Sequence, residues 1–161
     1  MRQLFLCCAI IWITLLWSCG FQLRGQAPLP VALATPYLES GDHYTPLYAA
    51  LQTRLRAAGA KLATNPATAS AVIHLRKDAT GREVLSVSAQ NTPSEYEVYY
   101  TVAYSVSAGG RELLALQQVT LTRDFSYDET AVLAKEHEED SLRTALADEL
   151  AGLMLRRLAA L

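Results

Sequence analysis

Apolar side chains recur along this chain at two spacings, one typical of helices and one typical of strands. A first helix is predicted between Thr45 and Gly59, where apolar residues return about every four positions. Thr45 suits the N-cap, and Pro46 suits the first helical position, where its missing N–H costs no hydrogen bond. Gly59 tolerates the left-handed backbone that often follows a helix. The residues of the apolar stripe are Leu47, Leu51, Leu55 and Ala58.

Strand patterns lie on both sides of this helix. Before it, a proline-rich tether leads into a segment with alternating apolar residues, and this alternation predicts a first strand. The residues on one side of that segment are Leu29, Val31, Leu33 and Thr35. After it, residues 71–76 and 84–89 are predicted as extended, with a kink or turn at residues 77–81. The clearest strand covers residues 96–106. One of its faces holds Tyr96, Val98, Tyr100, Val102, Tyr104 and Val106.

The remaining elements complete a small mixed fold. Gly109-Gly110 predicts a hairpin turn, and residues 113–123 its antiparallel partner strand. After a loop at residues 124–128, Asp128 is the expected N-cap of a last helix, with Glu129 in its first turn. The order β-α-β-β-β-α predicts an α+β fold with two helices packed on one face of a four-stranded mixed sheet. The stripe of the last helix is Leu142, Leu146, Leu150, Leu153 and Leu158.

Composition and charge narrow the possible partners. The chain has 161 residues, of which 51% are hydrophobic and 19% are charged, and we expect one globular domain over residues 29–161. The formal net charge is −2. A nucleic-acid-binding protein carries a basic surplus on some face, so this balance argues against a nucleic-acid partner.

The N-terminus resembles the export signal of a bacterial lipoprotein. Residues 4–17 are uncharged, which is a shorter run than the roughly 20 residues of a membrane-spanning helix and fits a signal peptide. The run ends in Leu-Trp-Ser-Cys at residues 16–19, which resembles a lipobox, although Trp17 is larger than the usual residue. We therefore expect a signal peptide at residues 1–18. Residues 19–36 would then form the lipidated N-terminus, the tether and the start of the first strand.

Lipidation at Cys19 would fix where the protein resides. The cysteine would carry a diacylglycerol group and an N-acyl chain, and two or more acyl chains hold a protein stably on a membrane. Gly20 follows, and the absence of Asp at that position favours an outer-membrane lipoprotein on the periplasmic side. The alternative is an ordinary signal peptide that happens to contain Cys19.

No catalytic or metal-binding motif is evident. Cys7 and Cys8 lie in the signal peptide, so no thiol remains after lipidation of Cys19. The three histidines lack the spacing of metal ligands. A dense acidic run on an amphipathic helix is expected to be solvated, which does not suit acid-base catalysis. We therefore expect a protein that is not an enzyme, with no cofactor apart from its lipids. The histidines are His43, His74 and His137, and the acidic run is Glu136, Glu138, Glu139 and Asp140.

Charge is distributed unevenly along the chain. Residues 124–149 have a net charge of −7, whereas residues 20–123 have a net charge of +2. Lys135 is embedded in the acidic segment. It either relieves repulsion among the acids or contacts a partner or an anionic ligand, and its spacing alone favours the first interpretation.

Several motifs, in order along the chain, resemble the LptE family of lipopolysaccharide-assembly lipoproteins. Cys-Gly-Phe-Gln-Leu-Arg-Gly at residues 19–25 is similar to the mature start of that family. Glu-Ser-Gly-Asp at residues 39–42 and Glu-Tyr at residues 95–96 also fit. The most specific similarity runs over residues 123–140 and includes the Ala-Lys pair at residues 134–135.

This resemblance implies a structural and transport role. Family members plug the LptD β-barrel of the outer membrane, help it assemble, and bind lipopolysaccharide on its way to the cell surface. Lys135 matches the lysine of the family's Ala-Lys motif and is the implied contact to lipopolysaccharide phosphate. The loop at residues 88–91 lacks the arginine of some members, so Arg82 or Arg123 would have to replace it. The alternative function is a periplasm-facing lipoprotein that binds another envelope assembly complex.

Overall fold

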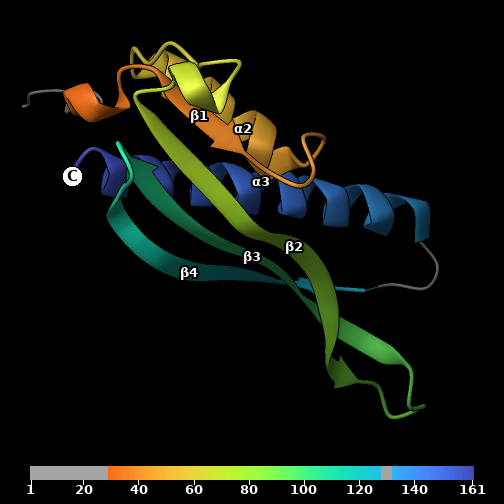
Figure 1. Cartoon of the computed structure of the whole chain (residues 1–161). Helices are drawn as coiled ribbons and strands as arrows, with labels where there is room; N and C mark the ends of the chain where they lie inside the picture. Colours follow the sequence, from red (N-terminus) through yellow and green to blue (C-terminus); the bar gives the residue numbers. More distant parts are fainter. Residues whose placement is uncertain (1–28, 128–131) are drawn as a thin grey trace, which may run out of the picture.

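The four strands form one sheet in the order β1-β2-β3-β4, with both long helices on the same face (Figure 1). The computed structural model describes residues 29–127 and 132–161. β1 pairs parallel with β2, and the other pairings are antiparallel. The predicted order and fold class are confirmed. The elements are η1 (Val31–Leu33), β1 (Pro36–Glu39), α2 (Pro46–Ala57), η2 (Pro66–Thr68), β2 (Ala71–Val87), β3 (Pro93–Ala108), β4 (Arg111–Ser126) and α3 (Val132–Leu158).

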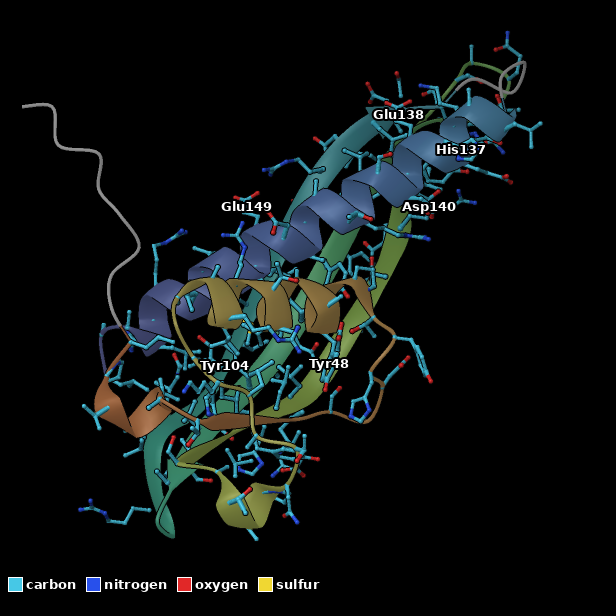
Figure 2. All side chains as sticks on the ribbon, turned by 90° about the horizontal axis from the view of Figure 1, so that it is seen from above. Tyr48, Tyr104, His137, Glu138, Asp140 and Glu149 are labelled. Atoms are coloured by element: carbon cyan, nitrogen blue, oxygen red, sulfur yellow. The ribbon has the colours of Figure 1, made fainter. Side chains whose placement is uncertain are left out.

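The core lies between the helices and the face of β3 that its even-numbered residues form. Val98, Tyr100, Val102, Tyr104 and Val106 are all buried there, as their alternation predicted. The leucine stripes of α2 and α3 cover this face. Both helices pack on one side of the sheet, and no helix covers the opposite face in the part of the chain that the structure describes (Figure 1). The first turns of α3 extend past α2 (Figure 2).

The ends of α2 follow from local sequence. Thr45 Oγ1 accepts a hydrogen bond of 3.1 Å from the backbone N–H of Tyr48, and Pro46 occupies the first helical position. Gly59 follows the helix with a φ of 91°, which a side chain would oppose. The predicted capping is therefore confirmed.

The predicted strand at residues 29–35 is wrong. Residues Val31–Leu33 form a short 3₁₀ helix, in which the N–H of Leu33 donates to the carbonyl of Pro30 over 2.8 Å. A turn of three residues points only one of them inward, so Leu33 is fully buried while Val31 is 89% exposed. The strand itself begins later, at Pro36.

The predicted break in the second strand is also wrong. β2 continues through residues 77–81, and its register against β3 shifts between Leu75 and Lys77 and again around Ser86. Gly81 pairs with Tyr99, whose ring lies where a Cβ on Gly81 would stand. This glycine therefore makes room for an aromatic ring inside a strand and does not form a turn.

In the last third of the chain, the predicted turn is present and β4 is longer than the predicted strand. Gly109 and Gly110, with φ of 56° and 77°, form the expected turn into β4. β4 runs on to Ser126 through the segment predicted as a loop, because Phe125 stacks on Tyr96 with ring centroids 5.8 Å apart. The expected cap at Asp128 and Glu129 lies outside the described residues. Within the described ranges, no helix has the length and apolar character needed to cross a membrane.

A partly buried polar network joins the start of α2 to the sheet. Asp78 accepts hydrogen bonds from Tyr100 Oη at 2.7 Å and from Thr45 Oγ1 at 2.5 Å. Burial, together with the bond to Asp78, raises the pKa of Tyr100, so the phenol stays neutral and remains a donor. The N-cap of α2 is thereby attached to both β2 and β3.

Replacing Tyr100 with Phe should lower the free energy of unfolding by about 1–2 kcal/mol, because Asp78 loses one of its two donors. Urea denaturation followed by circular dichroism measures this change. The matched control is Tyr44→Phe, at an exposed tyrosine, which should leave stability unchanged. Equal stability of the two variants would show that the network contributes nothing.

Candidate functional site

The three basic residues predicted to bind lipopolysaccharide lie on three elements that meet along α3. Arg82 on β2 and Arg123 on β4 are both in register with Val98 of β3. Paired residues in an antiparallel sheet share a face, so both arginines lie on the helix-covered side. Lys135 lies on α3 itself. Cys19 lies outside the described residues.

Lys135 is held by an acidic neighbour. Its Nζ donates to Glu138 Oε2 over 2.8 Å, and its side chain is only 18% exposed. A pair three residues apart on a helix is a local contact, as the charge-relief interpretation expects. The stem of the lysine is therefore partly covered, and its charged end lies beside an exposed carboxylate.

Glu139 is the buried centre of an ionic cluster. Its carboxylate accepts from Arg82 Nη1 at 2.6 Å and also from Arg143 Nη2. The residue is 5% exposed, so the prediction that the whole acidic run is solvated is wrong at this position. A buried carboxylate needs charged or polar partners, and two guanidinium groups supply them here. The same hydrogen bond raises the pKa of Arg82.

An aromatic platform holds Arg82 in place. The guanidinium carbon lies 4.8 Å from the centre of the Tyr96 ring, at a distance typical of a cation–π contact. Tyr96 is packed in turn by Phe125 and by Tyr127, whose ring meets it edge-on at 5.3 Å. The position of Arg82 therefore depends on three strand-end aromatics as well as on Glu139.

The structure separates Arg123 from the other basic residues. Arg123 Nη2 donates to Glu149 Oε2 over 2.7 Å. Glu149 lies ten residues beyond Glu139, about 15 Å farther along the helix. In Figure 2 Glu149 is well separated from Glu138 near the start of α3.

Arg143 joins the site instead, and sequence reasoning missed it. Lys135, Glu139 and Arg143 follow one another at four-residue spacing and so lie along one side of α3. This spacing was the available signal, but only the fold adds Arg82 from β2. We call Lys135, Arg82 and Arg143 the basic cluster.

The histidines do not assemble a metal site. Among residues 29–127 and 132–161, no group of three potential His, Cys, Asp or Glu ligands comes together. His74 is hydrogen-bonded through Nδ1 to Glu39 and through Nε2 to Ser107, at 2.9 Å for the latter. This row crosses from β1 through β2 to β3 and links the strands.

Comparison with known proteins identifies the family. The family model described as "LptE: Lipopolysaccharide-assembly" matches residues 33–158, which span the sheet, both helices and the basic cluster. This chain belongs to the LptE family. The sequence resemblance to that family is thereby confirmed.

Curated LptE relatives cover most of the chain. The LPS-assembly lipoprotein LptE of Pectobacterium atrosepticum is 32% identical over 143 residues, which are 88% of this chain and 77% of the relative. The LptE protein of Yersinia enterocolitica is 28% identical over 142 residues, 88% of this chain and 68% of that one. Both relatives are named LPS-assembly lipoproteins, and both match this chain over most of its length.

Solved structures share the LptE fold. Rare lipoprotein B from Shewanella oneidensis has a TM-score of 0.69 and 27% identity, covering 78% of this chain and 94% of that chain. Lipoprotein B from Nitrosomonas europaea has a TM-score of 0.71 and 26% identity, covering 88% and 91%. Both support the arrangement of sheet and helices described above.

Replacing Glu139 with Gln should lower the free energy of unfolding by about 2 kcal/mol, because two arginines lose the charge of their shared buried acceptor. The control is Glu138→Gln, one residue earlier and exposed, for which a loss below about 0.5 kcal/mol is expected. Urea denaturation of both variants provides the comparison. If Glu138→Gln lowered the free energy of unfolding as much as Glu139→Gln does, Glu139 would not be the centre of the ionic cluster.

Proposed function

We propose that this LptE-family protein is an outer-membrane lipoprotein, anchored on the periplasmic side, that plugs and helps assemble an LptD-type β-barrel and binds lipopolysaccharide in transit. The observation that carries the proposal is the family match over residues 33–158, which includes the basic cluster. The proposed role is binding and assembly, without catalysis and without a cofactor other than the lipids on Cys19.

The open face of the sheet supports the plug role. The interior of an outer-membrane barrel is polar, so a plug should present polar side chains. On this face Thr101 and Thr120 are hydrogen-bonded through their hydroxyls at 2.9 Å, and Tyr99 pairs with Thr122 one row away. The same face also carries charge, since Glu83, Glu97 and Asp124 lie in one row across β2, β3 and β4. Hydroxyl and charged side chains together make this a polar sheet face, which fits contact with such a wall.

The basic cluster supports the lipopolysaccharide role. Lipopolysaccharide carries phosphates, and lysine and arginine are the usual phosphate-binding side chains. We propose that Lys135 and Arg82 contact phosphate directly. Arg123, which lies apart beside Glu149, would contact a more distant part of the same ligand.

Membrane attachment is proposed to depend on Cys19 and on removal of residues 1–18. Cells expressing Cys19→Ala should yield an unprocessed precursor that incorporates no radiolabelled palmitate, because the acceptor thiol is missing. The Cys7→Ala, Cys8→Ala double variant is the control and should label normally. Palmitate still bound to the Cys19→Ala protein would contradict the lipoprotein assignment.

Replacing Lys135 with Gln should weaken lipopolysaccharide binding about tenfold or more, since one charge-assisted contact contributes about 1.5–3 kcal/mol. Glutamine keeps two of the four methylene groups of the lysine stem, so the loss of folding stability should stay at about 0.5 kcal/mol. Affinity and melting temperature are measured on the same protein. Lys61→Gln, at an exposed lysine outside the cluster, is the control. Unchanged affinity with a lowered melting temperature would make Lys135 a structural residue.

The barrel partnership is tested by affinity purification from detergent-solubilised outer membrane. Recovery of a large β-barrel protein in a one-to-one complex is the expected result. Recovery of a different envelope assembly complex would favour the alternative function, in which this protein is a binding module of that complex.

A further inference from the structure

We propose that the anchored protein, before it joins a barrel, rests one end of its domain on the anionic phospholipid surface around its own lipid anchor. At this end, which we call the cationic end, η1, the C-terminus of α3 and the turn between β3 and β4 lie together (Figure 1). The proposal rests on the lipid anchoring at Cys19 proposed above and adds to it the orientation of the domain on the membrane. The cations of this end are Arg56, Lys61, Arg111, Arg156 and Arg157.

Ion pairing divides the cations of the protein into two groups. Residues 29–127 and 132–161 contain twelve lysines and arginines, and six of these pair with a carboxylate. The other six form no ion pair within those ranges, and five of the six are the residues of the cationic end. The paired residues are Arg54, Arg76, Arg82, Arg123, Lys135 and Arg143.

Little acidic charge offsets the cationic end. Residues 29–35, 56–70, 107–112 and 155–161 hold its five basic side chains and one acidic side chain, that of Glu112. All five cations are exposed. Like charges gathered on one surface repel one another, and an anionic lipid surface relieves this repulsion. Charge alone therefore favours an anionic partner at this end.

The cations lie on folded elements that are fixed to one another. The N–H of Lys61 donates to the carbonyl of Ala34 over 2.9 Å, and the N–H of Ser70 donates to the carbonyl of Thr35 over 2.9 Å. These bonds hold the loop between α2 and β2 against the segment that leads into β1. Arg156 lies in the last turn of α3. The cationic end is therefore a built surface of the domain.

The chain from the proposed anchor enters the domain at this same end. Leu29 is ten residues after Cys19 and directly precedes η1. Ten residues span at most about 35 Å even when they are fully extended, so the cationic end stays within that distance of the membrane. A tethered surface meets its partner at a high effective concentration, so individually weak contacts are sufficient.

Exposed apolar side chains accompany the charges. Val31 in η1 is 89% exposed, and Leu161 beyond the end of α3 is 44% exposed. Surfaces that lie on a membrane combine cations with apolar side chains that enter the headgroup region. Both side chains belong to segments of the cationic end, so this end offers the two kinds of group that a phospholipid surface binds.

The opposite end of the domain carries the reverse charge. Glu83, Glu97 and Asp124 lie in one row across β2, β3 and β4, toward the turn between β2 and β3. Anionic lipid repels these carboxylates while it attracts the cationic end, so the surface field orients the domain. The start of α3, where lipopolysaccharide is proposed to bind, then points away from the membrane.

The test measures how near each end of the domain lies to the bilayer. Lipidated protein, purified without a barrel partner, is reconstituted into vesicles of phosphatidylethanolamine and phosphatidylglycerol that contain a lipid with a quenching headgroup. Lipidation uses Cys19, and no other thiol follows it, so one introduced cysteine gives one fluorescent label. The two label sites are Ala160→Cys at the cationic end and Gln90→Cys between β2 and β3.

We expect strong quenching of the label at residue 160 and much weaker quenching at residue 90. The quenching at residue 160 should be lost in vesicles of phosphatidylcholine and at high salt, because both remove the electrostatic attraction. The protein should still float with the vesicles under both conditions, since its acyl chains hold it there.

Arg156→Gln combined with Arg157→Gln tests the cations themselves. Losing two basic residues near an anionic surface should weaken the contact about 30-fold and remove most of the quenching at residue 160. The matched control is Arg76→Gln combined with Lys77→Gln, which removes the same charge from adjacent exposed positions in β2. The control should leave the quenching unchanged.

A second variant keeps the test valid if the α3 variant does not fold. Lys61→Gln combined with Arg111→Gln removes two cations from the loop after α2 and from the start of β4. This variant should also remove most of the quenching at residue 160. Unchanged quenching in a folded variant of either kind would overturn the proposal.

The remaining outcomes separate this inference from the function beneath it. Protein that does not float with the vesicles would overturn the lipid anchor at Cys19 and the orientation with it. Protein that floats, but whose label at residue 160 is quenched no more than that at residue 90, would overturn the orientation and leave the anchor intact. An equal loss of quenching in the β2 control would show a general effect of net charge and would also overturn the cationic end as the contact.

Discussion

Burial of one face of β3 is the constraint on which the rest of the structure depends. Val98, Val102 and Val106 are fully buried on that face, and each apolar side chain removed from water contributes about 1.5–3 kcal/mol. Only α2 and α3 can cover it, so both must lie on the same side of the sheet. That leaves the polar side of the sheet available for contact with another molecule, which the proposed plug role requires.

Toward the start of α3 the interface with the sheet changes from apolar to ionic. Beyond the reach of α2, Glu139 takes the inward position that leucines occupy farther along the helix, and it is satisfied by Arg82 and Arg143. A buried ion pair is weak evidence for stability but does fix position. The same contacts that hold this end of the helix therefore gather cations where an anionic ligand can reach them.

Sequence reasoning succeeded where the determining interactions are local. Thr45 and Gly59 act within a few residues of the helix they bound, and their roles were predicted. Gly81 was misread as a turn because the ring that requires it belongs to Tyr99 on the neighbouring strand. The burial of Glu139 could not be predicted either, since its partner Arg82 is 57 residues away. The fold class was thus predictable, and the composition of the site was only partly so.

The central claim is that lipopolysaccharide binds across the first turns of α3 and the adjoining part of β2. Hydrogen–deuterium exchange of the lipidated protein, measured with and without lipopolysaccharide, tests it most directly. We expect slower exchange on binding in residues 132–143 and 80–84, with exchange in α2 unchanged. Protection confined to α2 or to the turn at Gly109 and Gly110 would contradict it.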